Sequence, residues 1–330
     1  MKLRYAMKRI VILEVALGLF LWSTASAFQG GGGESTKKGS TNKKAVPKKK
    51  TSGAKSANTT PPRPPAPPAR EEEERRTPPK PPMNAGPTKY AKAGNEGIIR
   101  GTVNFTGTAP TPAMIDMSQD GACVRKNPNA TAENVVVHNG KLANVLVYVG
   151  YGTTANGHKI SDYSFDVPGT SAILDRNGCH YKPRVVGLQV NQNLSIKNSD
   201  PTTHNFHPTP RVNLEWNWTQ TNNSPDIVKT FTRAEVLIPV KCNVHRWMRA
   251  WIGVFNHPFF GVSGEDGSFQ IEGLPPGEYT IVAWHEDFGA KTGKAKVDAN
   301  RTAIVDFSYD GSKSAALNRS LQIMPVIKLP

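Results

Sequence analysis

The stretch Val236-Leu237-Ile238-Pro239-Val240-Lys241-Cys242-Asn243-Val244-His245-Arg246-Trp247-Met248 decides the fold of this chain. An apolar run from Val236 to Val240 stops just before Cys242, and a second run, Trp251–Phe255, follows Met248. Short runs rich in β-branched and aromatic residues, with polar residues between them, predict strands. The stretch is therefore predicted to be two strands joined by a loop that carries a cysteine, a histidine and a methionine.

Similar runs of Val, Ile, Phe, Tyr and Thr occur on both sides of this stretch, with Gly, Asn, Asp and Pro between them. They are Ile98–Phe105, Asn144–Val149, Val185–Val190, Leu194–Lys197, Phe269–Ile271 and Tyr279–Trp284. Strands that recur roughly every 8–15 residues between turn residues predict an all-β sandwich or barrel. No long segment has helical periodicity, so the predicted fold class is all-β.

A second polar segment, Asn198-Ser199-Asp200-Pro201-Thr202-Thr203-His204-Asn205, supplies another histidine upstream of the loop. The two segments together offer two imidazoles, a thiolate and a thioether, from His204, Cys242, His245 and Met248. Copper is held by such a set, two His and a Cys in a trigonal arrangement with a weak axial Met. Zinc also accepts Cys and His, but it does not favour a thioether. His207, three residues after His204, is the alternative first ligand.

The pattern Cys-x-x-His-x-x-Met after an apolar strand, with His204-Asn205 upstream, resembles the cupredoxins, which are small blue-copper proteins. The short gap between His and Met is similar to the loop of amicyanin. The resemblance covers residues 163–257 and includes Cys179–Pro183 and Val190–Asn198. It implies a Greek-key sandwich with one type 1 copper and one-electron transfer.

Residue by residue, the resemblance implies copper on His204, Cys242, His245 and Met248. It also implies that Asn205, beside the first histidine, ties the two ligand loops together. The bulky pair Arg246-Trp247 departs from the family pattern. We expect the ring edge of His245 to reach solvent, with Arg246 and Trp247 forming a docking patch beside it; the alternative is that Trp247 packs inward over the copper.

Two cysteines remain once Cys242 is assigned to the metal. In an exported protein, the simplest state of the leftover pair Cys123 and Cys179 is a disulfide. The alternative is two separate buried thiols.

The flanking segments carry a second resemblance. The run Asp266-Gly267-Ser268-Phe269-Gln270-Ile271, followed by Leu274-Pro275-Pro276-Gly277, is similar to the carboxypeptidase regulatory-like, transthyretin-type β-sandwich. Gly97–Val103 and Leu142–Val149 are similar to the first two strands of that family. We therefore predict that residues 96–162 and 258–310 form one sandwich, interrupted by the cupredoxin-like segment 163–257. Two sandwiches in series are the alternative.

The first 27 residues have the features of an export signal. Lys2, Arg4, Lys8 and Arg9 precede an apolar stretch, Ile10–Trp22, and Ala25-Ser26-Ala27 offers a small-residue cleavage site. Cleavage is the expectation, and an uncleaved anchor is the alternative. Export predicts a periplasmic or extracellular protein in an oxidising compartment.

Residues 28–95 have a composition of low complexity. They contain fifteen basic and five acidic residues and a Pro-rich tract, Pro61–Pro68. They contain little that a core could bury, so we expect a disordered tether that can also contact an anionic cell surface. Residues 311–330 are expected to be a C-terminal extension. Because residues 96–330 are nearly neutral, a nucleic-acid partner is not expected.

Two classes of function follow from this pattern. The first is an exported electron carrier with copper as its cofactor and a protein redox partner that the sequence does not name. The second is a cell-surface binding or structural sandwich in which copper is absent or only stabilising. The chain has no Gly-x-Ser-x-Gly or His-Glu-x-x-His motif, and we expect it not to be an enzyme.

Overall fold

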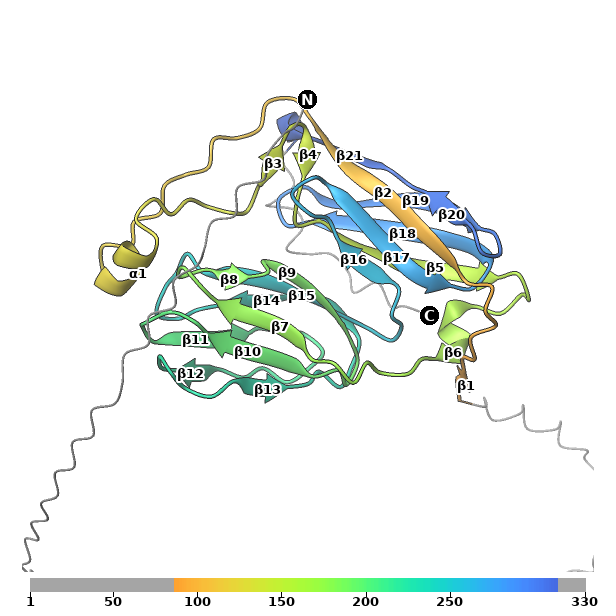
Figure 1. Cartoon of the computed structure of the whole chain (residues 1–330), viewed down its shortest axis with the longest axis horizontal. Coiled ribbons are helices and arrows are strands. Elements are labelled where there is room, and N and C mark those ends of the chain that lie inside the picture. The colour runs from red at the N-terminus through yellow and green to blue at the C-terminus, as the bar shows by residue number, and fades with distance from the viewer. Residues whose placement is uncertain (1–85, 314–330) are drawn as a thin grey trace, which may run out of the picture. The chain divides into compact units, whose positions relative to one another are not determined.

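The computed structural model describes residues 86–313. The predicted signal peptide, residues 28–85 of the predicted tether and residues 314–330 of the predicted extension lie outside the described residues. Nearly all of the regular structure is β, as predicted (Figure 1). Within the described range, no helix is both long and apolar enough to cross a membrane.

The predicted disordered linker needs one correction at its C-terminal end. Strand β1 (Thr88–Lys89) pairs in parallel with β6 (Tyr163–Ser164). The ring of Tyr90 packs against the rings of Tyr163 and Phe165 at 5.4 Å. This aromatic contact fixes a segment that its composition alone assigned to the linker.

Two sheets form the sandwich that carries the predicted ligands. The first has the order β13 (Ile227–Lys229), β10 (Leu194–Asn198), β7 (Ala172–Arg176) and β8 (Tyr181–Lys182). The second has the order β12 (Trp218–Gln220), β11 (His204–Pro208), β14 (Glu235–Lys241), β15 (Arg249–Phe255) and β9 (Val185–Gln189). Side chains from both sheets, among them Leu174, Ile196, Ile238 and Ile252, share one core. The burial of these apolar residues is what holds the two sheets together.

The flanking segments form further sheets with their own core. One sheet has the order β16 (Phe260–Val262), β5 (Leu146–Thr154), β18 (Gly277–His285) and β19 (Gly289–Val297). The other joins β17 (Ser268–Leu274), β2 (Gly97–Thr106), β4 (Lys141–Leu142) and β3 (Val137–His138), and β20 (Thr302–Ile304) and β21 (Phe307–Asp310) also pair with β2. Short 3-10 turns are η1 (Ile160–Asp162) and η2 (Gly311–Lys313).

Strands that precede the ligand-bearing segment therefore share these sheets with strands that follow it. β5 precedes the ligand-bearing segment, and it pairs with β16 and β18, which follow that segment. Gly267 has φ 71° in the turn before β17, a conformation that suits glycine and fits the predicted Asp266-Gly267 turn. The domain boundaries and the transthyretin-type assignment remain predictions.

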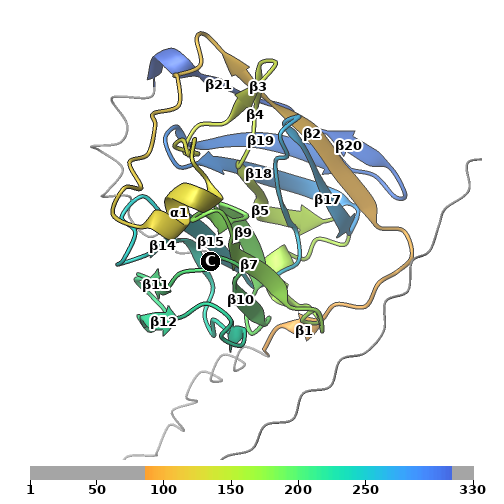
Figure 2. The ribbon, with the colours of Figure 1, turned by 60° about the vertical axis from the view of Figure 1, so that its left-hand side comes forward.

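A short helix, α1 (Gly121–Lys126), belongs with the first sandwich. Cys123 on this helix forms a disulfide with Cys179, the pairing expected from the sequence. Met117, Cys123 and Ala130 all pack in the same core as β11, β14 and β15. Figure 2 shows α1, in yellow, beside the green strands of that sandwich. The segment around α1 thus contributes to the surroundings of the predicted metal site.

Candidate metal centre

The loop between β14 and β15 holds three of the four predicted ligands. The antiparallel register pairs Lys241 with Arg249, so the loop spans Cys242–Met248. The Cys242 N–H donates to the Met248 carbonyl at 3.3 Å, and the Met248 N–H donates to the His245 carbonyl at 3.0 Å. These two bonds close the loop on itself, which fixes where its side chains point.

His204 reaches the same place from the neighbouring strand. It is the first residue of β11, and β11 pairs antiparallel with β14 through His207↔Lys241. The ligand atoms of His204, Cys242 and His245 lie within 4.8 Å of one another, and all three residues are buried. The structure therefore brings together three predicted ligands from two segments, although 41 residues separate the two histidines in sequence.

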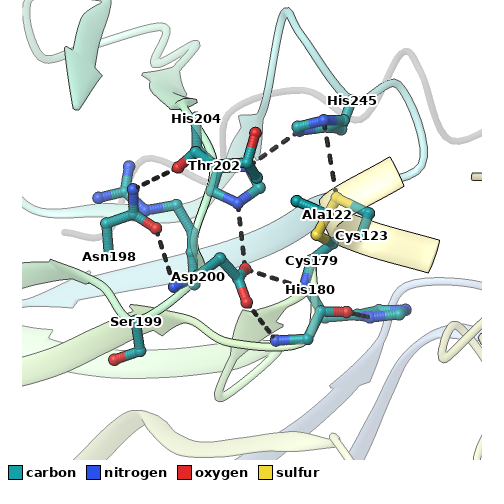
Figure 3. Close-up of polar contacts among 12 residues, drawn as sticks. Ala122, Cys123, Cys179, His180, Asn198, Ser199, Asp200, Thr202, His204 and His245 are labelled. Atoms are coloured by element: carbon teal, nitrogen blue, oxygen red, sulfur yellow. Dashed lines mark hydrogen bonds and ion pairs between the residues drawn. A yellow bond between two sulfur atoms is a disulfide. The ribbon is translucent and has the colours of Figure 1, made fainter. Parts of the chain in front are cut away.

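The two histidines face each other through the same ring atom. The Nδ1 atoms of His204 and His245 are 2.9 Å apart (Figure 3). The Cys242 Sγ lies 3.9 Å from the His245 Nδ1. The Asn205 N–H donates to the Cys242 Sγ at 3.3 Å. The tie between the two ligand segments is thus made by the Asn205 backbone, whereas its side-chain amide donates to Thr219 Oγ1 at 2.8 Å.

Each histidine has a carboxylate on its outer nitrogen. The His204 Nε2 lies 3.0 Å from Asp200 Oδ2, and the His245 Nε2 lies 3.0 Å from Asp120 Oδ2. A carboxylate accepts the Nε2–H, which leaves the Nδ1 lone pair free for a metal and fixes the orientation of the ring. Neither carboxylate was predicted from the sequence. Asp200 stands in the same polar segment as His204, but nothing local in the sequence points to Asp120.

Both carboxylates are themselves held by further donors. Asp120 caps α1, accepting from the Ala122 N–H at 2.8 Å and the Cys123 N–H at 3.3 Å, and it also accepts from Thr202 Oγ1 at 2.7 Å. Burial acts to raise its pKa, but the bonds from Thr202 and His245 prevail and lower the pKa to about 2. Asp120 is therefore a fixed anion at neutral pH.

Asp200 is held in the same way from the disulfide side of the site. It accepts from the Gly178 N–H at 2.7 Å and the Cys179 N–H at 2.8 Å (Figure 3). Burial acts to raise the pKa of Asp200, but the bonds from His204 and from these two amides lower it. The outer nitrogen of His204 thus meets a carboxylate that stays ionised.

Cys242 is poised as a thiolate. Its burial acts to raise the pKa, but the hydrogen bonds from His204, His245 and the Asn205 N–H lower the pKa to about 5. Burial acts to lower the pKa of His204, but Asp200 and Cys242 favour its charged form more strongly, so this pKa is raised. The two pKa shifts have a common cause, because the Cys242 thiolate and the protonated His204 ring stabilise each other. The site therefore favours a positive charge beside Cys242.

This donor set fits a metal cation. Two carboxylates and a thiolate converge on two imidazoles whose Nδ1 atoms lie 2.9 Å apart. Negative charge buried in this way is costly unless a cation neutralises it. The residues that would hold the metal are His204, Cys242 and His245. Met248, the fourth predicted ligand, is 1% exposed and packs in the adjoining core.

His207, the alternative first ligand, faces away from this centre. Its Nδ1 lies 3.0 Å from Asn243 Oδ1 and its Nε2 lies 2.7 Å from Glu215 Oε1. His207 and His204 are an odd number of residues apart on β11, so they point to opposite faces of the strand. The geometry therefore favours His204 as the ligand.

The expectation that the ring of His245 reaches solvent is wrong. His245 is 2% exposed, and its Nε2 contacts both Asp120 and the Cys123 Sγ, the latter at 3.8 Å. Trp247 lies with its ring centre 5.0 Å from that of His245 and donates its Nε1–H to the Cys179 carbonyl at 3.0 Å. Arg246 is exposed, whereas Trp247 is half-buried. Helix α1 and its disulfide therefore cover the ring edge that was expected to reach solvent.

No family model matches this chain, and no curated protein matches it in sequence. Among solved structures it is similar to amicyanin from Paracoccus versutus, with 17% identity over 33% of this chain and 96% of amicyanin and a TM-score of 0.24. It is also similar to a purple cupredoxin from Nitrosopumilus maritimus, with 16% identity over 26% of this chain and 99% of that protein and a TM-score of 0.23.

A third similarity is to the copper-containing nitrite reductase from Thermus scotoductus SA-01. It has 16% identity over 27% of this chain, spans 23% of the reductase and has a TM-score of 0.22. The structural neighbours are thus cupredoxins, and the TM-scores of all three are low. The transthyretin-type resemblance of the flanking segments is not supported by these similarities.

Proposed function

We propose that this chain is an electron carrier with one type 1 copper, held by His204, Cys242, His245 and Met248. The proposal is carried by one observation: the ligand atoms of His204, Cys242 and His245 lie together in a buried place, and the pKa of the Cys242 thiol is lowered. The Nε2 atom of each histidine is bound by a carboxylate. Copper in such a site takes up and releases a single electron.

The surroundings of the site suit this role. The ligand loop is closed by backbone bonds, Asp120 and Asp200 fix the two imidazoles, and the disulfide Cys123–Cys179 fixes the segment that carries Asp120. Ligands held in this way move little between two oxidation states. Such preorganisation favours fast electron exchange over the binding and turnover of a substrate.

The candidate metal ligands of the described residues gather around the two histidines. Among residues 86–313, three groups of His, Cys, Asp and Glu bring their ligand atoms within 4.8 Å of one another, and each of them includes His204 or His245. A second, separate metal centre is thus not formed by the described residues.

Cys242→Ser tests the proposal. Serine offers a harder and less acidic donor than a thiolate, so the variant should lose the intense visible band and most of its copper. Copper content and the visible spectrum of the purified chain are the measurements, and His207→Gln, which alters a histidine outside the site, should keep both. A wild-type chain that binds zinc, or no metal, without colour would point instead to a surface-binding or structural protein.

We also propose that the protein is exported and that the basic tether contacts anionic cell-surface groups. The disulfide Cys123–Cys179 supports the first part, since disulfides persist in oxidising compartments. The charge of residues 28–95 supports the second. Binding to anionic vesicles that weakens with salt, and that is lost when residues 28–85 are deleted, would test it.

A further inference from the structure

The covered ring of His245 raises the question of where electrons enter and leave. We propose that a line of aromatic rings, Tyr181–Phe206–Trp216, connects the metal centre with an exposed patch formed by Trp216, Trp218 and Lys229. This patch is the surface at which an anionic redox partner exchanges the electron. The inference rests on the proposed function.

The inner end of the line touches the backbone beside two of the ligands. The buried Tyr181 hydroxyl lies 2.5 Å from the Asn205 carbonyl and 3.1 Å from the Lys241 carbonyl. Asn205 follows His204 in sequence, and Lys241 precedes Cys242. One phenol group on β8 therefore lies within hydrogen-bond reach of both ligand-bearing strands at the point where the ligands leave them.

The rings continue without a gap toward the surface. The ring centre of Tyr181 is 5.8 Å from that of Phe206, edge to face, and Phe206 stacks on Trp216 at 5.3 Å. These are the separations of rings in direct contact. Phe206 is fully buried, and Trp216 is half-buried. The three rings thus cross the core from the metal side to solvent.

The outer end of the line is exposed and positively charged. The Lys229 Nζ lies 4.6 Å from the ring centre of Trp218 and 5.9 Å from that of Trp216. Trp218 is 49% exposed, and Val228, next to Lys229, is 52% exposed. An apolar surface with a cation at its centre is suited to a partner that carries negative charge.

The ligand loop offers a poorer exit. Its exposed residues include Val244 and Arg246, which flank His245, but Asp120 and Cys123 lie between that ring and solvent. The aromatic line bypasses this cover.

The electron step itself is simple. With copper bound by His204, Cys242, His245 and Met248, one electron would pass from the reduced site to the oxidant, and no bond or proton would be exchanged. Hexacyanoferrate(III), an anionic one-electron oxidant, is the probe. Its second-order rate constant with the reduced, copper-loaded chain is measured by stopped flow, together with copper content, visible spectrum and midpoint potential.

Phe206→Leu breaks the line, and Phe231→Leu is its matched control. Both phenylalanines are buried in the same core, but Phe231 is outside the line, so the two changes cost similar packing energy. We expect the rate to fall severalfold in Phe206→Leu alone, with spectrum and potential unchanged in both. Equal rates in the two variants would overturn the relay. Trp216→Leu makes the same test at the outer end, should Phe206→Leu fail to fold.

Lys229→Gln and Arg246→Gln locate the docking surface, because each removes one positive charge at a different place. We expect Lys229→Gln alone to slow the reaction and to weaken its salt dependence. The opposite result would place the exchange at the ligand loop and overturn the proposal. A wild-type chain without copper or colour would instead refute the proposed function.

A second readout needs no electron transfer. Hexacyanochromate(III) has the same charge and shape as the oxidant, and its paramagnetism broadens the NMR signals of the groups it approaches. In the metal-free chain we expect the indole N–H signal of Trp218 to broaden before that of Trp247. Broadening of Trp247 first, or of both equally, would contradict docking at the Trp218 patch.

Discussion

Asp120 Oδ2 lies 3.0 Å from His245 Nε2, although 125 residues separate the two in sequence. The carboxylate also caps α1 and accepts from Thr202. One side chain therefore joins the helix, the β10–β11 loop and the ligand loop. This contact gives the candidate metal site its second carboxylate and also covers it from solvent.

Asp120→Asn should weaken copper binding, because it removes the anion that orients and polarises His245. Loss of such a partner typically costs about 10- to 100-fold in metal affinity. Competition with a chelator of known copper affinity measures the effect. Asp116→Asn, at an exposed aspartate that accepts from the Ser118 N–H, is the control, and equal affinities of the two variants would contradict a role for Asp120.

Replacing Cys123 and Cys179 together by serine should destabilise the fold. The disulfide closes a separation of 56 residues, and the chain-entropy account assigns such a closure about 4 kcal/mol. Urea unfolding followed by fluorescence measures the difference. Without the disulfide, α1 is held only by packing and by Asp120, so we also expect bound copper to exchange faster. If stability and copper exchange are both unchanged, the disulfide does not hold α1 over His245.

His257 should make the protein acid-sensitive. Its Nε2–H donates to the Val149 carbonyl at 3.0 Å and its Nδ1 accepts from the Phe259 N–H at 3.2 Å, so the ring is held in the neutral form. Burial lowers its pKa to about 4. The folded pKa lies below the unfolded value of about 6.5, so this stability is complete above pH 6.5 and declines toward pH 4, by about 3 kcal/mol in total.

Unfolding free energies measured between pH 7 and pH 4 would test this, with His257→Gln as the variant. We expect a shallower decline in His257→Gln than in the wild type. His138→Gln, at an exposed histidine, is the control and should follow the wild-type curve. Parallel curves for all three proteins would exclude His257 as the source.

The part of the site that could be predicted from the sequence is the part set by local chain geometry. Cys242, His245 and Met248 stand on one loop between two recognisable strands, so their spacing alone indicates that they lie together. His204 required only the further assumption that its strand end lies beside this loop. Antiparallel pairing of β11 with β14 supplies that proximity.

The residues that cover the ring of His245 could not be predicted from local spacing in the sequence. It comes from residues 115–130, which the domain prediction assigned to the other sandwich, yet their apolar side chains pack in the core of this one. The one clue was the leftover cysteine pair, because a bond between Cys123 and Cys179 places α1 near β8. Where the Asp120 side chain then points depends on helix capping and packing, which no local pattern records.

Trp247 is the residue for which the sequence left docking and packing open. Its indole N–H donates to the Cys179 carbonyl and its ring lies against His245, which favours packing over docking. Trp247→Phe keeps a ring but loses the donor, whereas Trp247→Ala removes both. We expect copper retention and the visible band to fall slightly in the first variant and strongly in the second, while the electron-exchange rate per bound copper stays unchanged. Slower exchange with an intact spectrum in Trp247→Ala would instead make Trp247 a docking residue and return the exchange surface to the ligand loop.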